Sequence, residues 1–251
     1  MINKRKGKNL DLNKIYNEDC LGNKGMCLIP DKSIDMILCD MPYGTTVCKW
    51  DTLLDLDALW KEYKRIIKDN GVIVLTGSQP FTSKLVMSNI KWFKYEWIWK
   101  KDNGTGHLNA KKQPLRNHEN IIVFYNKQSK YNPQMMPGKK YYVSRGSNSK
   151  NYGSQTNCVT NDYKGKRYPH SIIAFQRDKN KLHPTQKPVN LFSYLIETYS
   201  NEGETVLDCC IGSGTTAIAC IRTDRKCIGI EKEQKYIDIT NKRIEDENKI
   251  L

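Results

Sequence analysis

An apolar strand that runs directly into a glycine turn and then a helix constrains the fold of this chain most. Residues 204–221, ETVLDCCIGSGTTAIACI, hold a short apolar run, glycines at positions 212 and 214, and a helical pattern that begins at Thr215. The glycines allow a ligand to approach the backbone, and the start of the helix offers free N–H groups. Taken alone, the segment is equally typical of a plain tight turn.

The same succession of strand and helix recurs along the chain. Strands are expected in SIDMILC, GVIVLTG, WFKYEWIWKK, NIIVFYN and KCIGIE, because each is short and rich in apolar, aromatic or β-branched residues. Residues 53–68 repeat apolar side chains at helical spacing and are expected to stop at Asp69-Asn70-Gly71. Residues 189–200 and 233–244 predict two further helices. Such alternation favours an α/β fold with a mostly parallel sheet covered by helices.

The chain is strongly basic. Its 251 residues include 41 lysines and arginines against 27 acidic residues, a net charge of +14. A nucleic acid is therefore the leading partner, and an anionic membrane surface the weaker alternative. No apolar run reaches the roughly 20 residues that span a bilayer, and the basic N-terminus lacks the apolar stretch of a secretory signal. A cytoplasmic location is expected.

Residues 126–182 differ in character from the rest of the chain. Their apolar periodicity is poor, their only acids are Asp162 and Asp178, and aromatic residues alternate with basic ones. Basic groups neutralise phosphates while rings contact bases, so a nucleic-acid contact region is predicted, with a solvated disordered loop as the alternative. The basic residues are Lys127, Lys130, Lys139, Lys140, Arg145, Lys150, Lys164, Lys166, Arg167, Arg177, Lys179 and Lys181, and the aromatic ones are Tyr131, Tyr141, Tyr142, Tyr152, Tyr163, Tyr168 and Phe175.

Nine cysteines raise the question of a metal or disulfide framework. Their number is odd, no C-x-x-C pair is present, and several lie in apolar runs. Reduced, buried thiols that pack as small hydrophobic groups are therefore expected, and no metal site is predicted. The cysteines are Cys20, Cys27, Cys39, Cys48, Cys158, Cys209, Cys210, Cys220 and Cys227.

An acid follows the glycine turn at the distance typical of nucleotide-binding folds. Glu231 ends the strand CIGIE about 20 residues beyond the turn, where a carboxylate can accept hydrogen bonds from ribose hydroxyls. The third glycine of a dinucleotide fingerprint is absent, since Ala217 lies in the helix instead. Hydride transfer is therefore disfavoured, and a ligand with one ribose and a carboxylate, such as S-adenosylmethionine, fits better.

The stretch LCDMPYG places an acid, a proline, a tyrosine and a glycine directly after a buried strand. Asp40 and Tyr43 together can grip a flat ring that carries an amino group. The alternative is structural, with Asp40 capping the following turn and Tyr43 packing as an ordinary aromatic.

Four segments together resemble the amino-group DNA methyltransferases, which act on adenine N6 or cytosine N4. DMPYG resembles their D-P-P-Y motif, and DCCIGSGTT resembles their D-P-F-x-G-S-G-T-T cofactor loop. HPTQKP, at residues 183–188, and IYNEDCL, at residues 15–21, are similar to two further family segments. The order of the motifs is that of the β class, in which the catalytic motif precedes the target-recognition region and the cofactor loop.

The resemblance implies a Rossmann-like fold that uses S-adenosylmethionine, as one domain over residues 1–251 with residues 126–182 as an inserted DNA-recognition region. Two departures from the family are Met41, in place of the first proline of the catalytic motif, and Cys209-Cys210, in place of Pro-Phe. The methionine keeps the backbone carbonyl that the family uses. The implied catalytic residues are Asp40, Met41, Pro42 and Tyr43, and the implied cofactor-binding residues are Asp19, His183, Thr185, Gln186, Lys187, Asp208, Cys210, Gly212, Ser213, Gly214, Thr215, Thr216 and Glu231.

The expected reaction is methyl transfer to adenine N6 in double-stranded DNA, after the base is flipped from the helix. An aspartate at the start of the motif favours adenine in this family. Cytosine N4, RNA or protein-glutamine methylation, and a catalytically weak DNA-binding homologue are the alternatives. Cytosine C5 chemistry is excluded, because no proline here is followed by the cysteine nucleophile it needs. A homodimer is possible, and a prokaryotic cell or phage-infected host, with association to the nucleoid, is the expected setting.

Three further segments have two readings each. Trp50-Asp51 either border the base pocket or anchor a surface loop. His118 and Glu119, just before a strand, resemble a family element that favours a structural role. His107 lies in a glycine-containing loop that could cover the active site.

Overall fold

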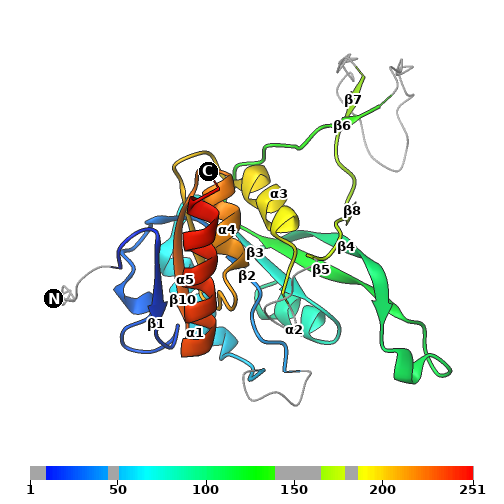
Figure 1. Cartoon of the computed structure of the whole chain (residues 1–251), viewed down its shortest axis with the longest axis horizontal. Coiled ribbons are helices and arrows are strands. Elements are labelled where there is room, and N and C mark those ends of the chain that lie inside the picture. The colour runs from blue at the N-terminus through cyan, green and yellow to red at the C-terminus, as the bar shows by residue number, and fades with distance from the viewer. Residues whose placement is uncertain (1–9, 45–50, 139–164, 179–185, 251) are drawn as a thin grey trace. The chain divides into compact units, whose positions relative to one another are not determined.

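The computed structural model describes residues 10–44, 51–138, 165–178 and 186–250 (Figure 1). The chain divides into two compact units, one made of residues 1–132 and 171–251 and the other of residues 133–170. In the described part, the larger unit holds a mixed sheet of eight strands and five α-helices. None of the described helices is long and apolar enough to cross a membrane.

The elements of the larger unit follow the predicted alternation of strand and helix. Short 3-10 helices lie at Met26–Leu28 and His107–Asn109. The α-helices are α1 (Leu56–Ile66), α2 (Phe81–Ser88), α3 (Val189–Tyr199), α4 (Thr215–Arg222) and α5 (Gln234–Asn248). The strands are β1 (Lys14–Asn17), β2 (Ile34–Cys39), β3 (Ile67–Gly77), β4 (Phe93–Thr105), β5 (Arg116–Phe124), β8 (Ile172–Ala174), β9 (Thr205–Asp208) and β10 (Lys226–Glu231).

The strands are arranged in the order β1-β10-β9-β2-β3-β5-β4-β8. All neighbours from β1 to β3 are parallel, β5 is antiparallel to both β3 and β4, and β8 is parallel to β4. The prediction of a mostly parallel sheet is therefore confirmed. The antiparallel pair β4 and β5 forms a long hairpin that extends beyond the helices, drawn in green in Figure 1.

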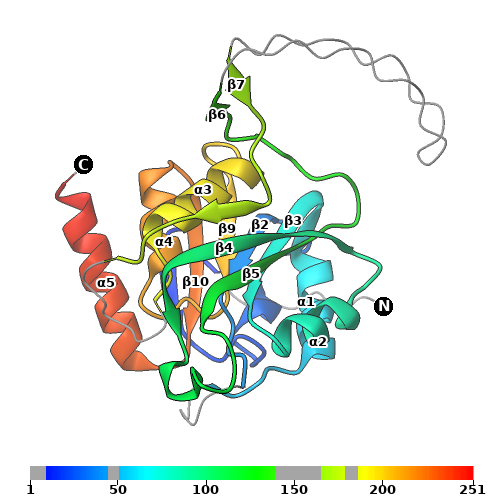
Figure 2. The same ribbon diagram turned by 90° about the vertical axis from the view of Figure 1, so that its right-hand side faces the viewer.

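Helices cover both faces of the sheet, α1 and α2 on one side and α3 to α5 on the other (Figures 1 and 2). Alternate residues of β2 show the two faces. Ile37 and Cys39 pack in the core cluster with α1, whereas Met36 and Leu38 pack in the cluster with α3 and α4. A strand buried on both sides has no polar face, which explains why its sequence is one continuous apolar run.

Helix α1 begins where Asp55 accepts hydrogen bonds from the backbone N–H groups of Asp57, at 3.0 Å, and Ala58, at 3.3 Å. It ends at Ile66, and β3 starts at the next residue. The expected stop at Asp69-Asn70-Gly71 lies inside β3, so that expectation was wrong. The pairing with β2 shifts register between Ile34 and Met36, and this irregularity accommodates the polar residues within the strand.

The parallel pairing brings two distant segments to the same edge of the sheet. Strands β2 and β9 are neighbours although about 170 residues separate them, and Thr205 donates its backbone N–H to Asp35 Oδ2 at 3.1 Å. Both strands run in the same direction. The segments that follow them, which begin at Asp40 and Cys209, therefore leave the sheet at one edge.

The second unit, described for residues 133–138 and 165–170, holds the two-stranded antiparallel pair β6 (Met136–Pro137) and β7 (Lys166–Arg167). Gly138 donates its backbone N–H to the carbonyl of Gly165 at 2.7 Å next to this pair.

Candidate active site

A cavity of about 770 Å³ opens at the carboxyl edge of the sheet. Asp40 and Tyr43, which follow β2, line it together with Gly212 and Thr216 of the turn after β9. Glu231, at the end of β10, lines the same cavity. The two motifs singled out in the sequence therefore share one hollow, as a reaction between a base and a cofactor requires.

Three side chains bind the carboxylate of Asp40. Tyr43 donates its hydroxyl to Oδ1 at 2.7 Å, and the hydroxyl of Thr76, near the end of β3, donates to the same oxygen. Lys187 donates Nζ to Oδ2 at 2.6 Å. Because ionised carboxylates have about four lone-pair positions, this arrangement leaves one acceptor position on Oδ2.

Lys187 is 5% exposed and lies between two carboxylates. Besides Asp40, its Nζ lies 3.3 Å from Glu119 Oε2, and Lys101 forms an ion pair with Glu119 Oε1. Burial alone would lower the pKa of Lys187, but the charges of Asp40 and Glu119 outweigh it and raise this pKa. The amine therefore stays protonated and balances the charge of Asp40.

The ring of Tyr43 stacks on Phe81 of α2, with centroids 5.2 Å apart and planes inclined by 21°. Lys187 Nζ lies 5.6 Å from the centroid of the Tyr43 ring. Burial, followed by the charge of Asp40, raises the pKa of Tyr43 well above its ordinary value. The hydroxyl therefore remains a neutral donor, and its bond to Asp40 fixes the orientation of the ring.

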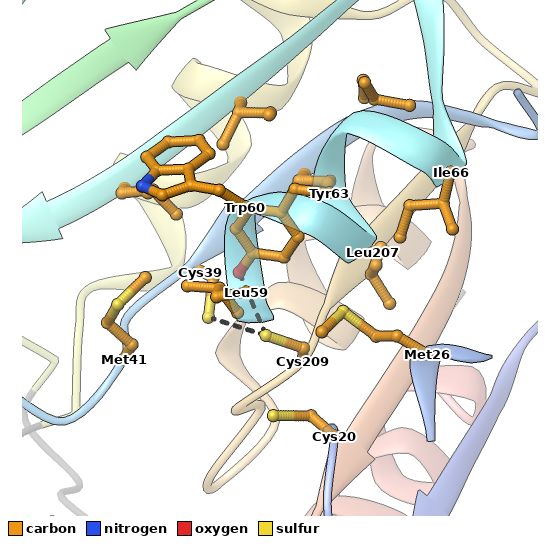
Figure 3. Packing of buried hydrophobic residues seen from close by; sticks show 14 of the residues in the cluster. Cys20, Met26, Cys39, Met41, Leu59, Trp60, Tyr63, Ile66, Leu207 and Cys209 are labelled. Carbon is orange, nitrogen blue, oxygen red and sulfur yellow. Dashed lines mark hydrogen bonds between the residues drawn. The ribbon is translucent and has the colours of Figure 1, made fainter. Parts of the chain in front are cut away.

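Met41 and Pro42 connect the acid to the ring. The side chain of Met41 is 2% exposed and packs in the core cluster with α1 (Figure 3). Pro42 is half-buried and lines the cavity. The methionine thus replaces the family's proline without leaving an exposed apolar side chain.

The turn after β9 is held by Asp208, which is 2% exposed. Its Oδ1 accepts the backbone N–H of Cys210 at 3.1 Å, and its Oδ2 accepts the hydroxyl of Thr216. Burial raises the pKa of Asp208 to about 7, against the opposite effect of these two hydrogen bonds. By accepting these two hydrogen bonds, Asp208 fixes the path of the turn between Cys210 and Thr216.

The two glycines of the turn have left-handed backbones, with φ of +53° at Gly212 and +85° at Gly214. A Cβ at Gly214 would lie 2.5 Å from Cγ2 of Thr240 on α5, so only glycine fits here. Gly214 also precedes α4, whose first turn has no side-chain cap. The free N–H groups of this helix start are suited to an anionic group.

Glu231 and Asp19 lie at the ends of β10 and β1. The carboxylate of Glu231 accepts backbone N–H groups of Gly212, at 2.9 Å, and Glu233, at 2.8 Å, one on each oxygen. Burial raises the pKa of Glu231. Asp19 is exposed, lines the cavity and accepts the N–H of Leu21 at 2.9 Å.

The segment before α3 connects the two motifs. The carbonyl of Lys187 accepts the hydroxyl of Thr215 at 3.3 Å, while its amine binds Asp40. Gln186 contacts Ser213 at 3.4 Å. Sequence analysis placed Lys187 with the cofactor, and the structure places its side chain at the catalytic motif. His183 and Thr185 lie outside the described residues.

Four cysteines also meet beside this cavity. The sulfur atoms of Cys20, Cys209 and Cys210 all lie within 4.8 Å of one another, and Cys39 Sγ lies 3.7 Å from Cys209 Sγ (Figure 3). Sequence analysis did not find this cluster, because its members lie at the ends of three strands that are far apart in the chain. No disulfide is formed among the described cysteines, and the thiols are free.

Several residues with two sequence readings are now placed. Asp51 is 8% exposed, accepts the N–H of Gly44 at 2.8 Å and lines the cavity, whereas Trp50 lies outside the described residues. His118 and Glu119 lie within β5, which begins at Arg116, rather than before the strand as expected, and they line the cavity. His107 is exposed at the tip of the β4–β5 hairpin.

Sequence analysis missed three side chains that complete the site. Thr76 is the next-to-last residue of β3, the parallel neighbour of β2. Its position at a strand end was therefore a sequence signal that it lies at the same edge of the sheet as Asp40. Lys101 and Phe81 had no such signal, because the direction of β4 and the packing of α2 cannot be read from local periodicity.

Comparison with known proteins gives a consistent result. The family model described as DNA methylase, of the N6/N4 type, matches residues 34–242. M.HpaI, a type II methyltransferase of Haemophilus parainfluenzae, is 28% identical over 244 residues, which cover 89% of this chain and 72% of the relative. M.HinfI, a type II methyltransferase of Haemophilus influenzae, is 31% identical over 270 residues, covering 94% and 69%.

Solved structures share the fold. The complex of M1.HpyAVI with SAM superposes with a TM-score of 0.63 at 23% identity and covers 92% of this chain and 98% of that chain. The PvuII DNA methyltransferase, described as cytosine-N4-specific, has a TM-score of 0.68 at 15% identity and covers 96% and 93%. The Rossmann-like fold expected from the sequence is therefore confirmed, and the first of these structures holds the cofactor that the sequence predicted.

Proposed function

This chain belongs to the N6/N4 DNA methylase family and is a DNA methyltransferase, and we propose that the base it methylates is adenine, at N6. The observation that supports this proposal is the Asp40 carboxylate, held at the cavity that also contains the Gly212–Thr216 turn. S-adenosylmethionine is the methyl donor and supplies an electrophilic methyl group at this cavity.

The residues around the turn fit that donor. Each oxygen of Glu231 accepts one backbone N–H and retains an acceptor position for a ribose hydroxyl. The uncapped start of α4 is suited to the donor's carboxylate. Cys210 presents a smaller apolar surface than the phenylalanine that it replaces, so we expect weaker packing against the donor.

Asp40 and Met41 activate the amino group. The lone pair of an adenine amino nitrogen is delocalised into the ring, which makes the nitrogen a poor nucleophile. In this proposal one N–H donates to the remaining acceptor position on Asp40 Oδ2, and the other donates to the backbone carbonyl of Met41. Both acceptors localise the lone pair on nitrogen, and the site contributes orientation and charge stabilisation.

Lys187 and Tyr43 assist Asp40. Lys187 donates to Oδ2 of Asp40 and so fixes the carboxylate in the position from which it can accept the amino hydrogen. The base must leave the helix, and we propose that it stacks on the face of Tyr43 opposite Phe81. Stacking on an aromatic ring is worth about 1 to 3 kcal/mol per base, which offsets part of the unstacking.

Mass spectrometry of digested product DNA tests the choice of base. The substrate is duplex DNA of mixed sequence that carries no prior methylation, incubated with the protein and tritiated donor. N6-methyladenine as the product supports the proposal, and N4-methylcytosine contradicts it. Binding of both DNA and donor without incorporation would favour the non-catalytic homologue, which the Met41 and Cys210 replacements make worth testing.

We also propose that residues 126–182 form the DNA-recognition insertion of a single methyltransferase domain. Not every basic residue there is available, since Lys130 pairs with Glu204 and with Asp35, and Arg177 pairs with Asp102 at 2.9 Å. Replacing Lys139 and Lys140 together by alanine should weaken DNA binding and reduce the slope of log affinity against log salt by about 1.8. Lys242→Ala, on the exposed face of α5, is the matched control.

Two expectations from the sequence complete this proposal. Homodimer formation stays a prediction, which sedimentation of the purified chain with and without DNA can test. A location with the cellular DNA is expected because DNA is the substrate.

An unchanged salt slope in the Lys139 and Lys140 variant would contradict the placement of the recognition region.

A further inference from the structure

Four thiols lie close together beside the cavity, at the carboxyl ends of three strands. Cys20 follows β1, Cys39 ends β2, and Cys209 and Cys210 follow β9. Figure 3 shows Cys20, Cys39 and Cys209 gathered below α1, with the Tyr63 hydroxyl 3.1 Å from Cys209 Sγ. Cys20, Cys209 and Cys210 also line the cavity.

The spacing of the sulfur atoms matches the size of a metal–thiolate centre. The three atoms of Cys20, Cys209 and Cys210 lie within 4.8 Å of one another. Some point lies within about 2.8 Å of all three atoms so spaced, and a zinc–sulfur bond is about 2.3 Å, so movements of about 0.5 Å bring the sulfur atoms to bonding distance. Cys39 Sγ lies 3.7 Å from Cys209 Sγ but is not part of this group of three.

We propose that Cys20, Cys209 and Cys210 form a binding site for one thiophilic divalent cation of the zinc type, with the fourth coordination position open to the cavity. Soft thiolate ligands select such ions over magnesium or calcium. Binding replaces each S–H bond with a metal–sulfur bond and releases one proton per cysteine, without any change of oxidation state. This proposal does not depend on which base is methylated.

A cation can reach these thiols through the cavity. Cys210 is partly exposed there, whereas Cys20 and Cys209 are 5% and 2% exposed. Hydrogen bonding to neighbouring thiols, together with burial, raises the pKa values of Cys20 and Cys210. The free thiols are therefore protonated, and the metal must displace protons. Affinity for the cation should rise with pH.

The other described cysteine pair provides a contrast on the opposite face of the sheet. Cys220 and Cys227 pack with α3 and α4, and no third metal-ligating side chain joins them among the described residues. This pair is buried among apolar side chains in the same way, but in the part of the chain that the structure describes it has no further sulfur atom within reach of a shared metal. Two buried thiols alone are expected to behave as small hydrophobic groups.

Occupation of the site should exclude the methyl donor. Cys210 belongs to the turn after β9 and lies two residues before Gly212. Its backbone N–H donates to the carboxylate of Asp208. Drawing the Cys210 sulfur toward Cys20 pulls on this turn and fills the part of the cavity where the family has a phenylalanine. Metal and donor therefore compete for the same few residues.

Titration of the full-length protein with cadmium ions tests the site, because a cadmium–thiolate bond absorbs in the ultraviolet and needs no enzyme activity. The protein is kept reduced with a phosphine that does not bind the metal. We expect a charge-transfer band that saturates at one equivalent and is reversed by a chelator. A parallel calorimetric titration should show weaker binding of S-adenosylhomocysteine to the loaded protein.

Paired variants assign the ligands. Replacement of Cys20 and Cys210 by serine should remove the band. The matched control, with Cys220 and Cys227 replaced by serine, should keep it. The same holds for Cys48 and Cys158, which lie outside the described residues. Circular dichroism verifies folding, and Cys210→Ala alone serves if the double variant unfolds. No band at one equivalent, or a band that survives loss of Cys20 and Cys210, would overturn the proposal.

Discussion

The two sides of the cavity are held in place by different kinds of groups. After β2, Asp40 is held by side chains alone, the hydroxyls of Tyr43 and Thr76 and the amine of Lys187. After β9, the turn that begins at Asp208 is shaped mainly by backbone groups and by glycines with positive φ. The first side is assembled from charges and hydroxyls of separate elements, and the second from the local path of one segment.

This difference teaches where each function is vulnerable. A side-chain network loses its effect when one charge is removed, although the backbone stays in place. A turn with glycines at positive φ is sensitive to any substitution that changes the path of the chain. Substitutions on the β2 side should therefore reduce the rate of methyl transfer, and those in the β9 turn should reduce donor binding.

The largest effect is expected for Asp40→Asn. The amide is a weaker acceptor and can present a donor to the amino group, so the single-turnover rate of methyl transfer should fall about 10³-fold. Donor affinity, measured by calorimetry, should change by less than about 2-fold. Asp246→Asn, an exposed position on α5, is the control. A comparable loss of donor affinity would contradict the separation of the two sides.

Lys187→Met should have the next largest effect, because it leaves Asp40 and Glu119 facing each other with Lys101 as the remaining cation. Removing one partner of a buried ion pair costs about 3 to 5 kcal/mol of folding stability. The single-turnover rate of methyl transfer should also fall, since the cation that binds and orients the Asp40 carboxylate is lost. Lys187→Arg, which keeps the charge, should retain most of the wild-type rate. An unchanged rate in Lys187→Met would show that Lys187 has no influence on Asp40.

Gly214→Ala tests the other side. Its Cβ would meet Thr240 Cγ2 at 2.5 Å, and its φ of +85° is strained for alanine. We expect donor affinity to fall about 10-fold and stability to fall by about 2 kcal/mol. Gly203→Ala is the matched control, because its φ is +76° and a Cβ there meets nothing within 4 Å. The control should lose about 1 kcal/mol of stability and no donor affinity. Equal effects of the two variants would remove the role given to the turn.

The smallest effect concerns Asp208, whose folded pKa of about 7 exceeds its ordinary value of 3.8 because of burial. The folded state therefore holds the proton more tightly than the unfolded state, so stability falls as pH rises from about 4 to about 7. Between pH 6 and pH 8 this contribution amounts to about 1 kcal/mol. Urea midpoints at both pH values measure it, and Asp208→Asn should remove it. Identical pH dependence in the two proteins would disprove the assignment.

Local sequence was enough to predict the elements that contribute to the site. The apolar runs of β2 and β9 and the glycines at positions 212 and 214 placed both motifs at strand ends. These features depend on residues close together in the chain. That the two motifs act together was implied by the resemblance to the methyltransferase family, and the pairing of β2 with β9 gives the structural reason.

Contacts between distant residues could not be predicted in the same way. Lys187 and Asp40 are 147 positions apart, and the cavity side of Lys187 depends on the path of the segment before α3. The convergence of Cys20 with Cys209 depends on strand order, which the sequence does not state. The polar residues inside β3 also required the register shift against β2, a property of the pair rather than of either strand.

The sheet order has a consequence for how the molecule is made. Strands β9 and β10 lie between β1 and β2, although the ribosome produces β1 and β2 first and this pair last. Strands β9 and β10 must therefore insert between strands that are made before them. Asp40 lies 147 positions before Lys187, so during synthesis the acid exists before the partners that complete its site.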